Sequence, residues 1–233
     1  MRARSAGLDV PPENPTMSEP ILPLPTFVAD AFARCPPLAD YGTPWRMSAH
    51  APDVVRAMLP MLGPEFVTVG EVAVHRSAVV EAGTVIRGPA IISEGCLVAG
   101  HAYLRGGVFL DRDVRVGPSC EVKASFVFHG STLAHLNYVG NSLIGSGVNL
   151  EAGVVLANHF NERRDKQISV VLGARLVQTG VEKFGALVGD ECCIGANAVT
   201  TPGTILPPRS IVGRLQLVDQ VAAYHARERA SVR

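Results

Sequence analysis

Two cationic side chains and one imidazole lie within a short stretch of the sequence. Arg105 and Lys123 each follow an aliphatic residue and are 18 residues apart, and His135 comes 12 residues later. If a structural repeat stacked the two cations about 5 Å apart, they would repel by roughly 3 kcal/mol at an effective dielectric of 20, and a bound anion would reverse the sign. An imidazole titrates near neutral pH and can move a proton. The residues therefore predict an anion site beside a base; the alternative is a solvated charged face that includes Glu121.

A six-residue periodicity indicates the elements that position these groups. An aliphatic residue recurs every six positions, and a residue that is usually small follows each one after four positions. The aliphatic series is Val74, Val80, Ile86, Ile92, Val98, Leu104, Leu110, Val116 and Val122. An amphipathic helix would repeat near 3.6 and a lone strand at 2, so neither explains a period of six. Short strands joined by tight turns do, and three of them close one coil of a left-handed parallel β-helix, an all-β fold.

The hexads divide the chain into four expected parts. They are residues 1–25, rich in proline and expected to be disordered or an upstream extension or tag; 26–66, a helical N-terminal cap; 67–216, the β-helix with an insertion at 157–187; and 217–233, a C-terminal helix. Because the ends of a solenoid expose its core, we expect the flanking helices to cover those ends.

Local patterns predict shorter elements inside these parts. Phe27 to Arg34 and Pro52 to Leu62 are expected to be helices, with Pro52 suited to a first helical turn. The segment VVLGARLV (170–177) predicts a hairpin within the insertion. Asp219 is a suitable N-cap for the final helix.

The overall composition limits the classes of partner. The 233 residues carry a formal net charge of zero, and 47% of them are hydrophobic. A balanced charge gives no support to a nucleic-acid or membrane-surface partner. No apolar run reaches about 18 residues, and the N-terminus lacks a basic segment followed by an apolar one. We therefore predict a cytoplasmic protein without a transmembrane helix or signal peptide.

Several motifs together resemble one known family of enzymes. They are HAYLRGG (101–107), EVK (121–123), AHLNYVG (134–140), GVNLEAG (147–153) and LAN (156–158). These segments resemble the acetyltransferase half of the bifunctional UDP-N-acetylglucosamine pyrophosphorylase / glucosamine-1-phosphate N-acetyltransferase. The insertion, with DKQISV (165–170) and TGVEKFGALVGD (179–190), is closer to archaeal sugar-1-phosphate nucleotidylyltransferase/acetyltransferases. The resemblance covers about Val74 to Arg214 and includes the β-helix.

The resemblance implies a role for each matching residue on the acceptor side. Arg105 and Lys123 would hold the phosphate of a sugar acceptor, and His135 would be the general base. Tyr138 and Asn149 would contact the sugar, and Asn158 would line either the acceptor site or the pantetheine region. The insertion would add a further cation, Lys166 or Arg164.

The same resemblance implies where acetyl-CoA binds. Ala152, Ala196 and Arg214 fall at the matching positions, and Arg214 would suit a CoA phosphate. Gly153 and its neighbours are candidates, by position, for donating backbone N–H groups to the tetrahedral oxyanion. One departure stands out, because Glu151 replaces a residue that is usually small. The active site would form between the subunits of a homotrimer.

The function implied is an acyl-CoA-dependent N-acyltransferase. The amine of an amino-sugar phosphate or nucleotide-sugar would attack the thioester while His135 removes its proton. The donor would be acetyl-CoA, a longer acyl-CoA or an acyl carrier protein, and no metal is required. No nucleotidyltransferase activity is expected, because the sequence contains no glycine-rich nucleotide loop with the Arg and Lys that should follow it.

Two other functions fit parts of the same pattern. Gamma-class carbonic anhydrases use this fold with three histidines at subunit boundaries, and His101, His129 and His135 would be the candidates here. The solenoid could instead be a non-catalytic module that binds sugar phosphates or promotes assembly. Glu151 and the missing nucleotidyltransferase domain motivate that second alternative.

Overall fold

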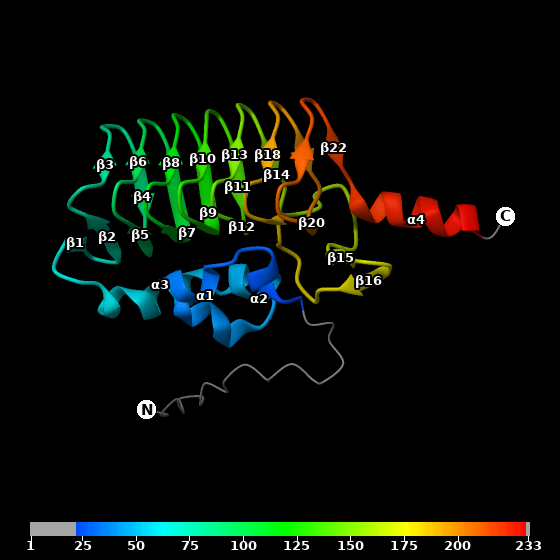
Figure 1. Cartoon of the computed structure of the whole chain (residues 1–233), viewed down its shortest axis with the longest axis horizontal. Coiled ribbons are helices and arrows are strands. Elements are labelled where there is room, and N and C mark those ends of the chain that lie inside the picture. Colours follow the sequence, from blue (N-terminus) through cyan, green and yellow to red (C-terminus); the bar gives the residue numbers. More distant parts are fainter. Residues whose placement is uncertain (1–21, 232–233) are drawn as a thin grey trace, which may run out of the picture.

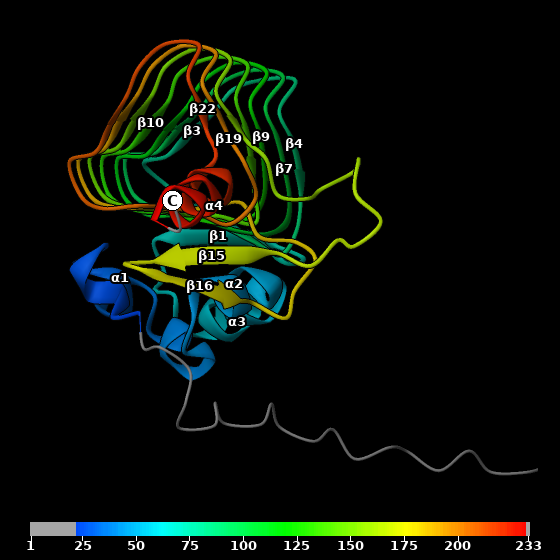
Figure 2. The same ribbon diagram turned by 90° about the vertical axis from the view of Figure 1, so that its right-hand side faces the viewer.

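A computed structural model describes residues 22–231 and shows a parallel β-helix with short helices along one side (Figure 1). The expected fold class is confirmed. When the C-terminal end faces the viewer, the chain winds clockwise as it advances, so the coil is left-handed (Figure 2). Residues 1–21, most of the expected disordered extension, lie outside the described residues. Leu22 and Leu24, near the end of that extension, are buried in a hydrophobic cluster.

One face of the prism, called the first face, is a sheet of seven short parallel strands. These strands are β3 (Val79–Val80), β6 (Leu97–Val98), β8 (Arg115–Val116), β10 (Thr132–Leu133), β13 (Asn149–Leu150), β18 (Cys193–Ile194) and β21 (Ile211–Val212). Each strand pairs with the equivalent strand of the next coil, so a residue's position on the face repeats from coil to coil.

The second and third faces are connected, because two long strands bend from one to the other. The second face holds β4 (Val85–Arg87), the first halves of β7 (Tyr103–Leu110) and β9 (Glu121–Val127), β11 (Tyr138–Gly140), β14 (Val155–Leu156), β19 (Val199–Thr200) and β22 (Leu217–Val218). The third face holds β2 (Val72–His75), β5 (Ala90–Ile92), the second halves of β7 and β9, β12 (Leu143–Ile144), β17 (Ala186–Val188) and β20 (Thr204–Leu206). At one edge β1 (Phe66–Val69) pairs antiparallel with β2.

The hexad residues fill the interior as the periodicity predicts. From Ile92 to Val122, every aliphatic residue of the series is fully buried in one continuous core. Cys96 and Cys120 occupy small inward positions in the same core. Burial raises the pKa of the Cys96 thiol to about 12, which makes it a poor nucleophile.

The third face is apolar on its outer side as well, and this determines where the helices lie. Its outward side chains are buried; they include Ile91, Phe109, Phe126, Leu143, Leu187 and Ile205. Each large apolar side chain removed from water contributes roughly 1.5–3 kcal/mol, so an uncovered face would be costly. The N-terminal helices cover it (Figures 1 and 2).

These helices therefore lie along the side of the solenoid and not across its end, unlike the expected cap. They are α1 (Ala31–Arg34), α2 (Pro44–Ala49) and α3 (Ala51–Met58), with 3-10 turns η1 (Leu24–Thr26), η2 (Pro36–Tyr41) and η3 (Leu59–Met61). The approach is close, because a Cβ at Gly107 would lie 2.4 Å from the Ala51 carbonyl carbon. Gly107 also has a φ of 89°, which glycine adopts without strain.

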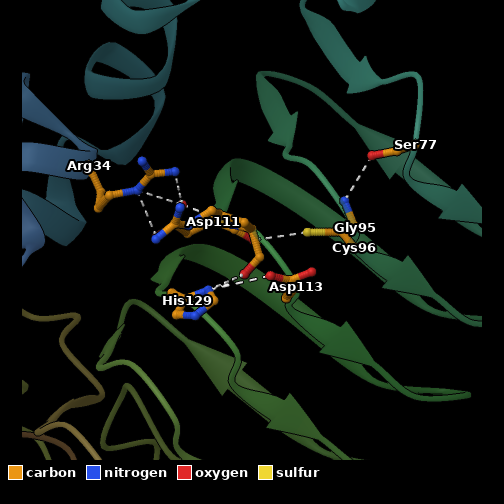
Figure 3. A network of polar contacts seen from close by, with 8 residues as sticks. Arg34, Ser77, Gly95, Cys96, Asp111, Asp113 and His129 are labelled. Atoms are coloured by element: carbon orange, nitrogen blue, oxygen red, sulfur yellow. Dashed lines mark hydrogen bonds and ion pairs between the residues drawn. The ribbon is translucent and has the colours of Figure 1, made fainter.

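An ion pair between a partly exposed arginine and a buried carboxylate joins this helical segment to the β-helix (Figure 3). Arg34 Nη2 lies 2.6 Å from Asp111 Oδ1, and Arg34 Nε donates to the same oxygen at 2.9 Å. The Asp111 side chain is fully buried, and it also accepts the backbone N–H of Arg112 at 2.8 Å. The hydrogen bond to Asp111 raises the pKa of Arg34. A charge buried to this extent needs its partner to remain stable in the interior.

The insertion folds back onto the third face. Its hairpin, β15 (Ser169–Leu172) and β16 (Arg175–Gln178), matches the hairpin predicted at 170–177. Ile168, Val170 and Phe184 are buried in the cluster that the N-terminal helices also join. The insertion therefore continues the cover of the third face toward the C-terminal coils.

The C-terminal helix α4 (Gln220–Ser231) follows the last coil. Asp219 Oδ1 accepts the backbone N–H of Ala222 at 2.9 Å, so Asp219 is the expected N-cap. Within residues 22–231, no helix is both long enough and apolar enough to cross a membrane.

Candidate active site

Arg105 and Lys123 lie opposite each other in register on β7 and β9, as their 18-residue spacing predicts. Arg105 Nη2 is 2.6 Å from Glu121 Oε1, so one carboxylate partly neutralises the pair. Lys123 is half-buried, and its pKa is lowered, first by burial and then by the charges of Lys183 and Arg105. Two cations in register, only one of which has a carboxylate partner, leave a positive surface suited to an anion.

Lys183 is the cation of the insertion whose charge acts on Lys123. The sequence favoured Lys166 or Arg164, but the Lys166 ammonium donates to the carbonyls of Phe160 and Asn161 at 2.8 and 2.9 Å. The Lys166 ammonium therefore stabilises the insertion loop through contacts within that loop. Lys183 directly precedes buried Phe184, where the chain returns to the third face, and no local sequence pattern identifies it.

Tyr138 and Asn158 come together beside these cations. The Tyr138 hydroxyl donates to Asn158 Oδ1 at 3.2 Å, and Asn158 Nδ2 donates to Asn141 Oδ1 at 2.6 Å. Gly140 pairs with Lys123 in the adjacent coil, and a Cβ there would lie 2.7 Å from both Asn158 Nδ2 and the Tyr138 oxygen. The polar cluster is thus packed directly over a glycine. Asn141 was not identified from the sequence.

His135 lies in the turn between β10 and β11, and its side chain is exposed. No side-chain hydrogen bond to its ring is formed within the described part of the chain. Its carbonyl accepts the N–H of Gly153 at 2.8 Å, so this candidate oxyanion donor is already engaged. Tyr138 follows three residues later, at the start of β11, and the last residue of that strand, Gly140, pairs with Lys123. Tyr138 therefore lies between the His135 corner and Lys123.

The residues implied for acetyl-CoA share the corner of His135. Strands β10, β13, β18 and β21 pair in sequence. Three residues after the start of each strand come His135, Ala152, Ala196 and Arg214, which we call the corner column. The carbonyls of the first three accept N–H groups from the next coil in turn, which fixes their alignment.

A groove on the first face borders this column and contains Asn149. It is lined by Asn149, Glu151, Cys193, Gly195 and Arg214, among others. Asn149 pairs with Cys193 in the sheet, so it lies on a different face from Tyr138. Within this chain the two expected sugar contacts therefore lie on either side of the corner. Cys193 is an exposed free thiol, unlike the four buried cysteines.

Glu151 already binds Arg214 and Ala196, two residues that the resemblance assigns to the acetyl-CoA site. Its Oε1 lies 2.7 Å from Arg214 Nη2, and its Oε2 accepts both Arg214 Nε at 2.9 Å and the N–H of Ala196 at 2.8 Å. The hydrogen bond to Arg214 is the main cause of the lowered pKa of Glu151. The carboxylate thus fills an anion position next to the corner column.

The three histidines considered for a metal lie apart. His129 Nδ1 is 3.2 Å from the Arg112 carbonyl and 3.7 Å from Asp113 Oδ2. His101 lies beside Gly83, and His135 lies at the corner described above. Among residues 22–231, no group of three or more His, Cys, Asp or Glu side chains could hold a metal ion.

The chain is similar to curated bifunctional sugar enzymes. It is 36% identical over 135 residues to a bifunctional sugar-1-phosphate nucleotidylyltransferase/acetyltransferase of Sulfurisphaera tokodaii, covering 58% of this chain and 33% of the relative. It is 35% identical over 120 residues to the bifunctional protein GlmU of Methanococcus vannielii, covering 51% of this chain and 28% of that protein. The chain therefore matches about a third of the length of these relatives. No family model matches.

Among solved structures, the chain is similar to a mutant perosamine N-acetyltransferase of Caulobacter crescentus in complex with CoA and GDP-perosamine. The identity is 15%, the match covers 60% of this chain and 50% of the other, and the TM-score is 0.24. A score this low carries no conclusion about the site. The sequence similarities and the coiled fold together fit a hexapeptide-repeat acetyltransferase domain.

Proposed function

We propose that the chain is an acyl-CoA-dependent N-acyltransferase that acts on an amino-sugar phosphate or nucleotide-sugar. The observation that carries the proposal is the pair of cations Arg105 and Lys123 in adjacent coils, with Lys183 near them and the Tyr138–Asn158 hydrogen bond beside them. Relatives named as sugar-1-phosphate nucleotidylyltransferase/acetyltransferases support sugar chemistry.

The cations would hold the phosphate of the acceptor. Half-buried Lys123 experiences the positive charges of Lys183 and Arg105, and a phosphate would relieve that repulsion. An arginine side chain can also bind two phosphate oxygens at once, which fixes orientation as well as position. Holding the acceptor in this way lowers the entropic cost of bringing its amine to the donor. The polar atoms of Tyr138 and Asn158, beside these cations, would recognise a sugar hydroxyl.

His135 would act as the general base. The amine nitrogen attacks the thioester carbonyl carbon, and the imidazole accepts the proton that the amine loses. The C–S bond then breaks, and the departing CoA thiolate takes that proton from the imidazolium, which regenerates the base. The exposure of the His135 side chain at the corner supports this role. Since Gly153 is engaged with the His135 carbonyl, an oxyanion donor has to come from another group.

Acetyl-CoA or a longer acyl-CoA would lie along the first-face groove beside the corner column. Arg214 would bind a CoA phosphate once Glu151 releases it. Exposed leucine and isoleucine side chains flank this corner, namely Leu136, Ile211, Leu215 and Leu217. A second copy packed there would cover them, which supports the proposed homotrimer with Asn149 contributing to a site between subunits.

The test is a free-thiol release assay with acetyl-CoA and a panel of amino-sugar phosphates and nucleotide-linked amino sugars. We expect the wild-type chain to release CoA with at least one acceptor and His135→Ala to lose about 100-fold or more of that rate. His225→Ala, on exposed α4, is the matched control and should keep full activity. A fully active His135→Ala variant would overturn the role of the base, and no release with any acceptor would overturn the transferase.

One observation favours a second function, a non-catalytic module that binds sugar phosphates. Glu151 already fills the anion position at Arg214 and Ala196. If calorimetry detected no binding of acetyl-CoA or longer acyl-CoAs while an amino-sugar phosphate still bound, the module would replace the enzyme as the preferred function.

A further inference from the structure

The row of cations extends one coil beyond the two residues assigned to the phosphate. Arg87 on β4 lies in register with Arg105 on β7, and Arg105 lies in register with Lys123 on β9. We call Arg87, Arg105 and Lys123 the cation row. Arg87 is exposed on the second face, and the proposed monophosphate contact leaves it without a role.

The spacing of the row suits two linked phosphoryl groups. Neighbouring strands in a sheet are about 4.8 Å apart, so three cations in successive coils leave two intervals along the solenoid axis. One phosphoryl group can lie in each interval and contact a cation on both sides. Two of the three cations are arginines, whose planar forks bind phosphate oxygens in pairs.

The row keeps a positive excess despite nearby carboxylates. Glu121 pairs with Arg105, and Lys183 adds its charge at the Lys123 end. Glu71, whose carbonyl accepts the N–H of Ala90 near Arg87, is held by Arg56 at 2.6 Å. The row and Lys183 therefore carry four positive charges, and Glu121 is the carboxylate paired with one of them.

The aromatic ring of Tyr103 holds both arginines on the outer surface. The Arg87 and Arg105 guanidinium carbons lie 5.7 and 5.6 Å from the centre of this ring. Cation–π contacts of this kind orient the guanidinium groups without neutralising them. Both guanidinium groups thus lie beside one ring, and the Arg105 group is also held by Glu121 Oε1, which accepts from its Nε at 2.8 Å.

The two ends of the row differ, which gives the ligand a direction. At the Lys123 end the next coil has Gly140, with the Tyr138–Asn158 pair packed over it. Neutral hydroxyl and amide groups there suit a sugar and not a further phosphate. At the opposite end Arg87 is exposed, so a group attached to the second phosphoryl would extend into solvent.

We propose that the acceptor is a diphosphate-linked amino sugar, whose sugar lies at Tyr138 and Asn158 and whose second phosphoryl group lies between Arg105 and Arg87. The inference rests on the proposed function, because it names the acceptor class of the same site. The diphosphate could belong to a nucleotide or to another carrier, and both present the same two phosphoryl groups to the row.

The test is calorimetry with inorganic pyrophosphate and inorganic phosphate at one ionic strength. In the wild-type chain pyrophosphate should bind about tenfold more tightly than phosphate, and Arg87→Gln should remove most of that difference while leaving phosphate affinity nearly unchanged. Arg175→Gln, an exposed arginine on the insertion hairpin, is the matched control and should change neither affinity. A further arm with uridine diphosphate tests the carrier: tighter binding than pyrophosphate supports a nucleotide, and equal binding supports another diphosphate ester.

Three results would overturn the inference. They are equal affinities for the two anions in the wild-type chain, an equal loss for both anions in Arg87→Gln, and a loss in Arg175→Gln as large as in Arg87→Gln. The thiol-release assay shows whether only the diphosphate inference fails or the proposed transferase function fails as well. If monophosphate acceptors are acylated at the same rate by Arg87→Gln, and diphosphate acceptors have no advantage, the diphosphate inference is wrong and the transferase stands. If no acceptor is acylated but pyrophosphate binding depends on Arg87, the transferase is wrong and the diphosphate site stands.

Discussion

Glu151 and Arg214 form a two-point ion pair that spans three coils of the solenoid. Both nitrogens of the contact lie within 2.9 Å of the carboxylate, and the same carboxylate accepts the N–H of Ala196 in the intervening coil. A carboxylate of the chain itself therefore lies next to the corner column and binds two of its residues. A donor phosphate bound at this position would compete with this carboxylate for the Arg214 guanidinium.

Replacing that carboxylate with an amide should tighten donor binding. In Glu151→Gln the side chain can still accept the N–H of Ala196, but it no longer neutralises Arg214. We expect the dissociation constant for acetyl-CoA to fall about fivefold to tenfold, measured by calorimetry. Glu228→Gln, on the exposed surface of α4, should leave that constant unchanged. Weaker binding by Glu151→Gln would show that the carboxylate helps to hold the donor.

Lys123 should lower the free energy of unfolding of the chain while contributing to the binding of an anion. Its ammonium is partly desolvated and lies near two other cations. Lys123→Met should raise the free energy of unfolding by about 0.5 kcal/mol after allowance for its partial exposure, or roughly 1–2 °C in Tm for a chain of this size. The same variant should bind inorganic phosphate about tenfold more weakly.

Lys166→Met is the matched control for this trade-off. Its ammonium donates to two carbonyls of the insertion loop, so its removal should lower Tm. Phosphate affinity should not change. If both lysine variants were destabilised to the same extent, Lys123 would be a structural residue like Lys166.

The stability cost of Lys123 should depend on pH. Its folded-state pKa is lowered, so the folded chain releases this proton at a lower pH than the unfolded chain does. The cost is fully present below the folded-state pKa and disappears as the pH rises through that value toward the unfolded one. The difference in Tm between Lys123→Met and the wild-type chain should therefore shrink in alkaline buffer. A difference that stays constant from neutral to alkaline pH would contradict this account.

The sequence predicted those features that follow from the hexads. Because an 18-residue spacing equals one coil, the register of Arg105 with Lys123 could be deduced without coordinates. The inward aliphatic series follows from the same period. Asp219 could be recognised because an N-cap depends on local chemistry alone.

The remaining features depend on contacts between distant segments. The helices cover the third face because its outward positions are apolar, and the spacing of Ala73, Ile91 and Phe109 was a signal that periodicity could have revealed. Lys183 approaches Lys123 only because the insertion folds back, and no local pattern determines that path. Glu151 and Arg214 meet across 63 residues that include the whole insertion. The insertion therefore hides this long-range pairing from an analysis of the six-residue period alone.

The attachment of the helical segment to the solenoid should depend strongly on Arg34. Arg34→Ala would leave the Asp111 carboxylate buried without its cation, although that carboxylate keeps the Arg112 N–H. Removing one partner of a buried pair costs about 3–5 kcal/mol, and the partial exposure of Arg34 reduces this to about 2 kcal/mol. The measurement is urea unfolding followed by circular dichroism.

Arg209→Ala is the matched control, because it breaks the exposed pair with Glu191, and it should leave the free energy of unfolding unchanged. Because Arg34→Met with Asp111→Leu removes both charges together, that double variant should recover most of the lost stability. A single variant as stable as wild type would show that apolar packing alone holds the helices on the third face.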